Sequence, residues 1–126
     1  THVHADHVTG LGELREQTGC ATVLGAQTRA DCVSRRVHDG EIIDVDGLKI
    51  RALHTPGHTD DSYSFVMEDR VFTGDTLLIR GTGRTDFQNG DPYAQYDSLF
   101  NNVYEELYRR VGDLSKILGS FALGLS

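Results

Sequence analysis

Long apolar runs, basic clusters and cysteine frameworks are all missing from this sequence. No stretch of its 126 residues approaches the ~20 consecutive apolar residues of a membrane-spanning helix, and its first residues are unlike a signal peptide. Only 12 Lys and Arg stand against 19 Asp and Glu, and the formal charge of −7 argues against nucleic acid or an anionic membrane as a partner. The two cysteines, Cys20 and Cys32, match neither a metal motif nor a disulfide scaffold. We therefore expect a protein of a reduced, cytoplasmic compartment.

Linkers, repeats and low-complexity tracts are also missing, which predicts one domain over residues 1–126. Apolar residues make up 38% of the chain, enough for a modest core. Asp46-Gly47 predicts a type I′ hairpin turn, and Asp91-Pro92 predicts the start of a helix. The sequence pattern predicts two helices, at Thr9–Gln17 and Asp91–Leu107. Between them it predicts strands at Ala21–Leu24, Glu41–Val45, Leu48–Leu53, Ser62–Val66 and Arg70–Phe72. Strands flanked by helices favour a mixed α/β layer architecture.

Potential metal ligands are densest at the start of the chain, in Thr-His-Val-His-Ala-Asp-His. His2, His4, Asp6 and His7 all lie in this stretch. Imidazoles packed so densely beside a carboxylate are costly without a cation to share them. A tag remnant or a solvated polar turn is the alternative, but the interspersed aspartate and the Thr9-Gly10 that follows favour a metal site.

Two further candidate ligands each follow a predicted strand. His58 lies in Thr-Pro-Gly-His-Thr, and Asp75 lies in Phe-Thr-Gly-Asp-Thr. The glycine before each one allows a sharp turn that directs the side chain toward the edge of a sheet. Alone, Asp75 is equally consistent with a turn or a helix cap. Its combination with the histidines indicates a metal ligand.

These three motifs, in this order, resemble the successive metal motifs of the metallo-β-lactamase superfamily over Thr1 to Ser98. Within the superfamily, Leu-Leu-Ile-Arg-Gly-Thr-Gly-Arg-Thr-Asp-Phe-Gln, from Leu77 to Gln88, is similar to the persulfide dioxygenase branch. The resemblance implies a metallo-β-lactamase-like αββα sandwich. We expect it to be incomplete at both ends, because the chain opens on the histidine cluster and has no histidine after His58.

The same resemblance implies a site that holds one Fe(II) per chain through His2, His58 and Asp75. Such a facial triad leaves positions open for substrate sulfur and for O2. His4, Arg84 and Asp86 are expected around the triad, where they orient ligands and substrate. The implied reaction converts glutathione persulfide, O2 and water into glutathione and sulfite, in the mitochondrial matrix if the source is a eukaryote.

Two alternatives stay open. A zinc-dependent thioester hydrolase of the glyoxalase II kind would use Asp6 and His7 to hold a second metal. The absent late histidine removes a ligand of that second metal and so favours iron. A non-catalytic metal-binding fragment is the other alternative. The sequence leaves a homodimer open.

Overall fold

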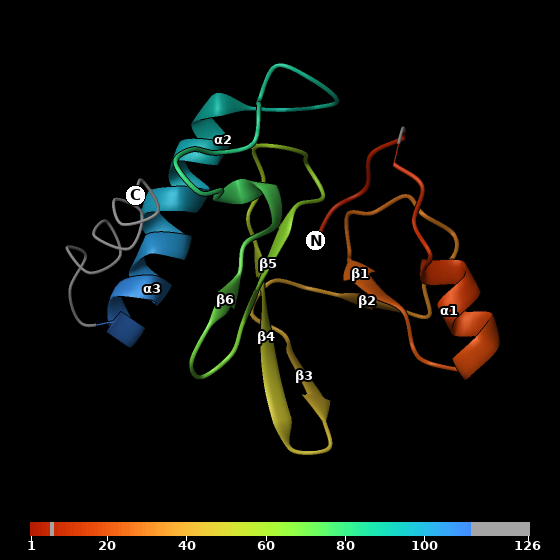
Figure 1. Cartoon of the computed structure of the whole chain (residues 1–126). Helices are drawn as coiled ribbons and strands as arrows, with labels where there is room; N and C mark the ends of the chain where they lie inside the picture. The colour runs from red at the N-terminus through yellow and green to blue at the C-terminus, as the bar shows by residue number, and fades with distance from the viewer. Residues whose placement is uncertain (6, 112–126) are drawn as a thin grey trace, which may run out of the picture.

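Two β-sheets and their flanking helices make up the part of the chain that is described. The computed structural model describes residues 1–5 and 7–111. Its elements, in chain order, are α1 (Leu11–Thr18), β1 (Val23–Gly25), β2 (Arg35–Val37), β3 (Ile42–Val45), β4 (Leu48–His54), β5 (Tyr63–Val66), β6 (Val71–Phe72), the 3-10 turn η1 (Gly74–Thr76), α2 (Pro92–Asp97), the π-helical η2 (Ser98–Val103) and α3 (Tyr104–Val111). Figure 1 shows the α2–α3 helix on one side of the larger sheet and the β1–β2 sheet with α1 on the other.

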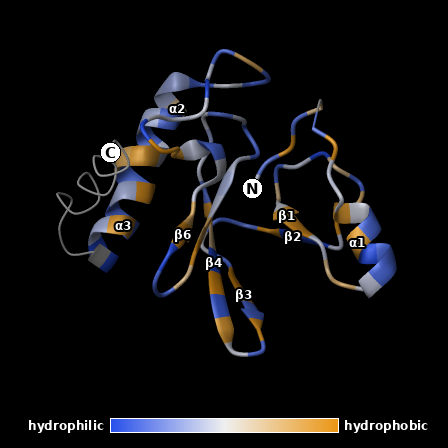
Figure 2. Cartoon of the chain, viewed as in Figure 1, coloured by the Kyte–Doolittle hydropathy of each residue, from blue (hydrophilic) through white to orange (hydrophobic). Residues whose placement is uncertain are grey.

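The larger sheet is antiparallel, with the strand order β3-β4-β5-β6. The β3–β4 hairpin closes where Val45 pairs with Leu48. Asp46 and Gly47, which join the two strands, have φ of 52° and 90°, as a type I′ turn requires. Apolar and hydrophilic residues alternate along β4 (Figure 2), as in a strand with two different faces. The hairpin that the sequence predicts is confirmed.

The smaller sheet pairs β1 with β2 in parallel. The sequence pattern did not predict β2, because two of its three residues are exposed arginines and only Val37 is buried. Val37 forms the core together with Ala52 and Tyr63. The Tyr63 ring lies against Gly25 of β1, and its hydroxyl donates a hydrogen bond to Gln27 at 2.9 Å. Tyr63 therefore joins the two sheets.

The segment from α2 to α3 is one helix with a π-helical middle. Asp91 caps it by accepting hydrogen bonds from the backbone of Tyr93 and Ala94, and Pro92 takes its first position. Leu99 and Val103 are buried, whereas Tyr96 and Phe100, which share the same sequence repeat, are exposed. Only a part of the repeated apolar residues therefore faces the sheet.

The first helix begins and ends close to where the sequence pattern places it. Residue Gly19 ends α1 in the left-handed conformation with φ of 68°. No side chain of α1 is buried. Within residues 1–5 and 7–111, none of the helices has the length and apolar character needed to span a bilayer.

Candidate metal centre

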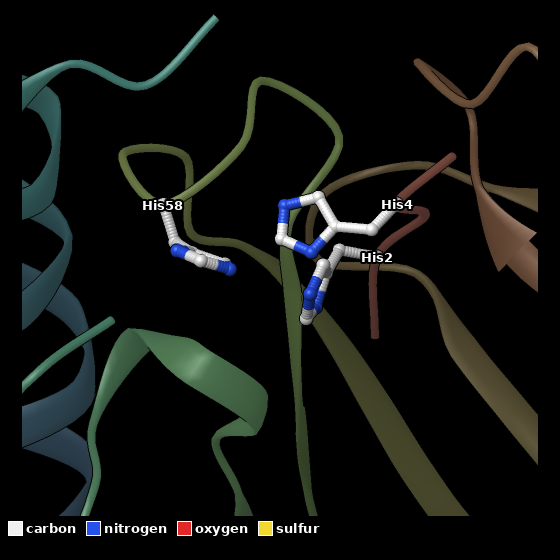
Figure 3. A group of neighbouring side chains, drawn as sticks. All are labelled: His2, His4 and His58. Carbon is white, nitrogen blue, oxygen red and sulfur yellow. The ribbon is translucent and has the colours of Figure 1, made fainter. Parts of the chain in front are cut away.

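Three imidazoles from two distant segments converge at one point. His2 and His4 come from the first residues of the chain, and His58 comes from the loop between β4 and β5. The ligand nitrogens of the three side chains all lie within 4.8 Å of one another. The rings stand nearly perpendicular in pairs, at 82°, 89° and 81°, and Figure 3 shows them turned toward a shared space.

A carboxylate from a third segment reaches the same space. Asp75 lies in η1, directly after β6, and its Oδ2 is 3.2 Å from His58 Nε2 and 3.8 Å from His2 Nε2. Two ligand atoms held at ~2.1 Å from one ion, at angles of roughly 90 to 110°, lie about 3.0 to 3.4 Å apart. The distance between Asp75 and His58 matches that of two side chains that share one ion, and the distance between Asp75 and His2 is slightly longer.

The donor set fits a metal cation. The Nε2 atoms of His2, His4 and His58 are buried and make no hydrogen bond within the described residues. A buried polar atom without a partner is costly, and most such atoms in proteins have one. A divalent cation would accept the lone pairs of all three nitrogens, and the carboxylate of Asp75 would offset part of its charge.

Hydrogen bonding sets the ligand nitrogen of His58. Its Nδ1 lies 2.7 Å from the carbonyl oxygen of Arg84. A carbonyl only accepts, so Nδ1 carries the proton and Nε2 presents its lone pair to the shared space. For His2, the corresponding contact is a hydrogen bond between Nδ1 and the Thr1 hydroxyl at 3.1 Å.

The electrostatics keep His2 suited to binding a cation. Burial and the neighbouring His58 lower the pKa of His2 below its ordinary value, and the nearby Asp75 only partly opposes them. A lowered pKa favours the neutral imidazole, which is the form that binds metals.

Glycines allow the sharp turns that place two of these side chains. Gly57, before His58, has φ of 142°, and Gly74, before Asp75, has φ of 51°. Both values lie in the region that disfavours side chains. At Gly57 a Cβ atom would also stand 2.3 Å from the Cα of Gln95. The two motifs therefore use glycine as the sequence pattern predicted.

Buried hydroxyl and amide groups hold η1 under the site. Thr76 donates to the Thr55 carbonyl at 3.3 Å, and the Gln95 side chain donates to the Thr76 carbonyl at 2.7 Å. Thr55 in turn shares a hydrogen bond of 3.0 Å with Ser64 of β5. These buried hydrogen bonds tie the backbone that carries Asp75 to the end of β4 and to the helix.

Of the other residues that the first motif offers as ligands, His4 lies in the cluster and His7 lies next to it. His4 contributes one of the three converging imidazoles. His7 is exposed, with its ring centroid 5.1 Å from that of His4. Asp6 lies outside the described residues.

Arg84 and Asp86 form an exposed ion pair beside the site, with Nε and Oδ1 2.7 Å apart. The guanidinium lies 5.6 Å from the centre of the Phe87 ring, which in turn is 6.2 Å from that of His4. The exposed side chain of Arg84 therefore lies at the outer edge of the metal site, which we call the rim, while its backbone carbonyl contacts His58.

Asp61 was not singled out by its sequence pattern, although it connects the two histidine segments. Its carboxylate accepts hydrogen bonds from the Thr59 hydroxyl at 2.8 Å and from the Val3 amide at 3.5 Å. Thr59 directly follows His58, and Val3 lies between His2 and His4. The Asp60-Asp61 pair offered no signal beyond its charge.

The chain resembles known proteins over most of its length. The model of the metallo-beta-lactamase superfamily matches residues 33–116. The human mitochondrial persulfide dioxygenase ETHE1 is 40% identical over 116 residues, which cover 90% of this chain and 44% of that protein. A hydroxyacylglutathione hydrolase of Rhodopseudomonas palustris (strain BisB18) is 41% identical over 88 residues, covering 67% of this chain and 34% of that one.

Structural comparison gives a consistent result. The crystal structure of ETHE1 from Myxococcus xanthus matches with a TM-score of 0.79 and 50% identity, over 83% of this chain and 46% of that chain. The chain spans less than half the length of these relatives. The resemblance to persulfide dioxygenases that the motifs indicate is confirmed. The match of the family model over residues 33–116, together with the fold, shows that the chain belongs to the metallo-β-lactamase superfamily.

Proposed function

We propose that this chain is the metal-binding part of a persulfide dioxygenase, which holds one Fe(II) through His2, His58 and Asp75. The observation that carries the proposal is the convergence of unpartnered imidazole nitrogens and one carboxylate on a single space. Two histidines and one carboxylate are the ligand set of non-haem Fe(II) oxygenases. Bound there, the iron would supply adjacent positions for the substrate sulfur and for O2.

The protein residues supply orientation and charge. The hydrogen bond from His58 Nδ1 to the Arg84 carbonyl keeps the Nε2 lone pair directed at the shared space. The His4 ring, 4.8 and 4.7 Å from the rings of His2 and His58, limits how either can rotate. We propose that His4 acts as an orienting group, or as a further ligand while substrate is absent.

The exposed guanidinium of Arg84 suits an anionic substrate. Asp86 holds two of its nitrogens, at 2.7 and 3.1 Å, which fixes the plane of the guanidinium beside Phe87. A persulfide is anionic, and glutathione carries two further carboxylates, so the guanidinium could hold one of these groups in place of Asp86. The overall reaction would convert glutathione persulfide, O2 and water into glutathione and sulfite, with both atoms of O2 transferred to the outer sulfur.

A zinc-dependent hydrolase of glutathione thioesters is the second candidate. Two observations support it: the third imidazole, His4, in the cluster and the similarity to hydroxyacylglutathione hydrolases. Three histidines with an open position form a common catalytic zinc site. The Arg84-Thr85-Asp86-Phe87 stretch supports the dioxygenase over the hydrolase.

Oxygen consumption separates the candidates. The chain is reconstituted anaerobically with Fe(II) or with Zn(II), and each form receives glutathione persulfide or S-lactoylglutathione. We expect oxygen uptake and sulfite only from the iron form with the persulfide. Thioester hydrolysis by the zinc form, with no oxygen uptake by the iron form, would replace the dioxygenase with the hydrolase. Iron bound stoichiometrically with neither activity would indicate a non-catalytic metal-binding chain.

A matched pair of variants links the activity to the site. His58→Ala removes a proposed ligand, whereas His38→Ala removes an exposed histidine outside the cluster. We expect the first variant to lose iron and oxygen uptake together and the second to keep both.

A further inference from the structure

A short loop after Asp75 contacts both of the segments that carry His58 and Asp75 through backbone hydrogen bonds. The Gly83 amide donates to the Asp75 carbonyl at 2.7 Å. The next residue, Arg84, accepts the hydrogen bond from His58 Nδ1 at 2.7 Å. At its base the loop is closed by Leu78, whose amide donates to the Gly81 carbonyl at 2.8 Å.

We infer that residues 81–84 form a backbone clamp and that Gly83 is a positioning residue for His58 and Asp75. The inference rests on the proposed metal site. One hydrogen bond of the clamp fixes the His58 tautomer and ring orientation, and the other fixes the backbone of Asp75. Since consecutive residues make these bonds, a shift of one ligand is transmitted to the other.

Gly83 has this role because no side chain fits at its position. A Cβ atom there would stand 2.5 Å from the Asp75 carbonyl oxygen, 2.7 Å from His58 Nδ1 and 2.8 Å from His58 Cγ. His58 is buried, only 5% exposed, so its ring has little room to move away. The φ of Gly83 is not positive, so the backbone conformation would itself allow alanine. The close contact with the ligand ring is what requires glycine.

Gly81, in the same loop, provides the contrast. A Cβ atom on Gly81 would have no atom of residues 1–5 and 7–111 within 4 Å, and its φ is not positive either. Alanine at Gly81 therefore changes the loop composition in the same way as alanine at Gly83, without touching a ligand. The pair separates an effect on the ligands from an effect on the loop.

The movement that Gly83→Ala would impose on the His58 ring is large compared with the variation in distance that a metal site tolerates. Lengthening the 2.7 Å contact between the new Cβ and His58 Nδ1 to the ~3.5 Å of an ordinary van der Waals contact requires a movement of about 0.8 Å. Metal–ligand distances hold to within about 0.2 Å, and supporting contacts outside the ligands commonly change metal affinity by about 10- to 100-fold. We expect Gly83→Ala to weaken binding by a factor in that range.

The first experiment needs neither metal nor turnover. In the unmutated metal-free chain, nitrogen-15 NMR of the imidazoles is expected to show His58 in the Nδ1–H tautomer, and hydrogen exchange is expected to show a protected Gly83 amide. Gly83→Ala is expected to lose the single tautomer, and Gly81→Ala to keep it. A His58 that carries its proton on Nε2 in the unmutated chain would overturn the inference, whether or not the variants fold.

Zinc and cobalt titrations then measure how each glycine variant changes the affinity for metal. We expect both affinities to fall about 10- to 100-fold in Gly83→Ala and to stay unchanged in Gly81→Ala. A folded Gly83→Ala with the original tautomer and affinity would refute the clamp. Failure of the dioxygenase proposal would show as missing oxygen uptake, whereas failure of the clamp would show in the tautomer and the affinities, so the two results are distinct.

Discussion

Metal-dependent stability follows from the way in which the ligands are distributed along the chain. His2 precedes α1, His58 lies in the loop between β4 and β5, and Asp75 lies in η1 after β6, so the three come from different parts of the chain. An ion that binds all three binds the folded chain and not the unfolded one. Asp75→Ala removes the carboxylate that lies 3.2 Å from His58 Nε2 and 3.8 Å from His2 Nε2, and should therefore remove most of this stabilisation.

Bound metal should stabilise the folded chain by a measurable amount. A ligand present at 100 times its Kd stabilises the folded state by about 2.7 kcal/mol. An unfolding entropy of about 2.1 cal/mol/K per residue amounts to about 0.26 kcal/mol/K over 126 residues. Saturating metal should therefore raise the Tm of the unmutated chain by about 10 °C. The same metal should raise that of Asp75→Ala by a small fraction of this.

Thermal melting with and without Zn(II), and anaerobically with Fe(II), measures both shifts, and elemental analysis gives the bound stoichiometry. His38→Ala is the control, because His38 is an exposed histidine outside the cluster, and it should keep the full shift. Asp75→Ala with an undiminished shift and one bound ion per chain would refute the triad. Loss of the shift in the control would show that the ion binds elsewhere.

Three further predictions concern the helix and the rim. Glu106→Gln should destabilise the chain by roughly 2 to 3 kcal/mol, because Arg51 and Arg110 would lose the charge of a buried partner. Burial of Glu106 opposes ionisation, but hydrogen bonds from Arg51 and Arg110 outweigh it and hold its pKa below the ordinary value of 4.5. A lowered pKa contributes stability at neutral pH that is lost as the pH falls below about 4.5. In urea denaturation, the free energy of unfolding should therefore fall more steeply with acid in the unmutated chain than in the variant. Equal dependence on pH in the two chains would contradict this. Val103→Ala, at a fully buried position, should cost roughly 2 kcal/mol in urea denaturation, and a change below 0.5 kcal/mol would place the helix off the sheet. Arg84→Ala should leave stability nearly unchanged, because its ion pair is exposed, and should raise KM for the persulfide while metal content stays constant. Loss of metal would show that the side chain, and not the carbonyl, supports His58.

Local signals determined much of the architecture. The β3–β4 hairpin was predictable because Asp46-Gly47 supplies the two positive φ values of the turn. The start of α2 was predictable because Asp91 caps the first turn and Pro92 fits its first position. Strand β2 was not predictable from its own residues, since its pairing with β1 and the burial of Val37 depend on residues distant in sequence.

The candidate ligands were likewise readable from the sequence. Histidines and aspartates in compact motifs indicate metal ligands, and the glycines before His58 and Asp75 indicate turns; the choice of His2, His58 and Asp75 as the triad came from the resemblance of these motifs to a known family and stays a prediction. That the Asp75 carboxylate lies 3.2 Å from His58 Nε2 and 3.8 Å from His2 Nε2 depends on the sheet. In it, β4 and β6 both pair antiparallel with β5, so the two strands end at the same edge.

The supporting contacts came only from the tertiary structure. Sequence reasoning placed Arg84 near the ligands for its charge, but the contact with His58 is made by its carbonyl, which every residue has. The importance of Gly83 comes from a ring that approaches it from 25 residues earlier in the chain. Residue types and their spacing therefore determined which chemistry this protein carries. Only the tertiary structure decided which backbone atoms position the ligand side chains, because every residue has the same backbone amide and carbonyl and the sequence does not distinguish them.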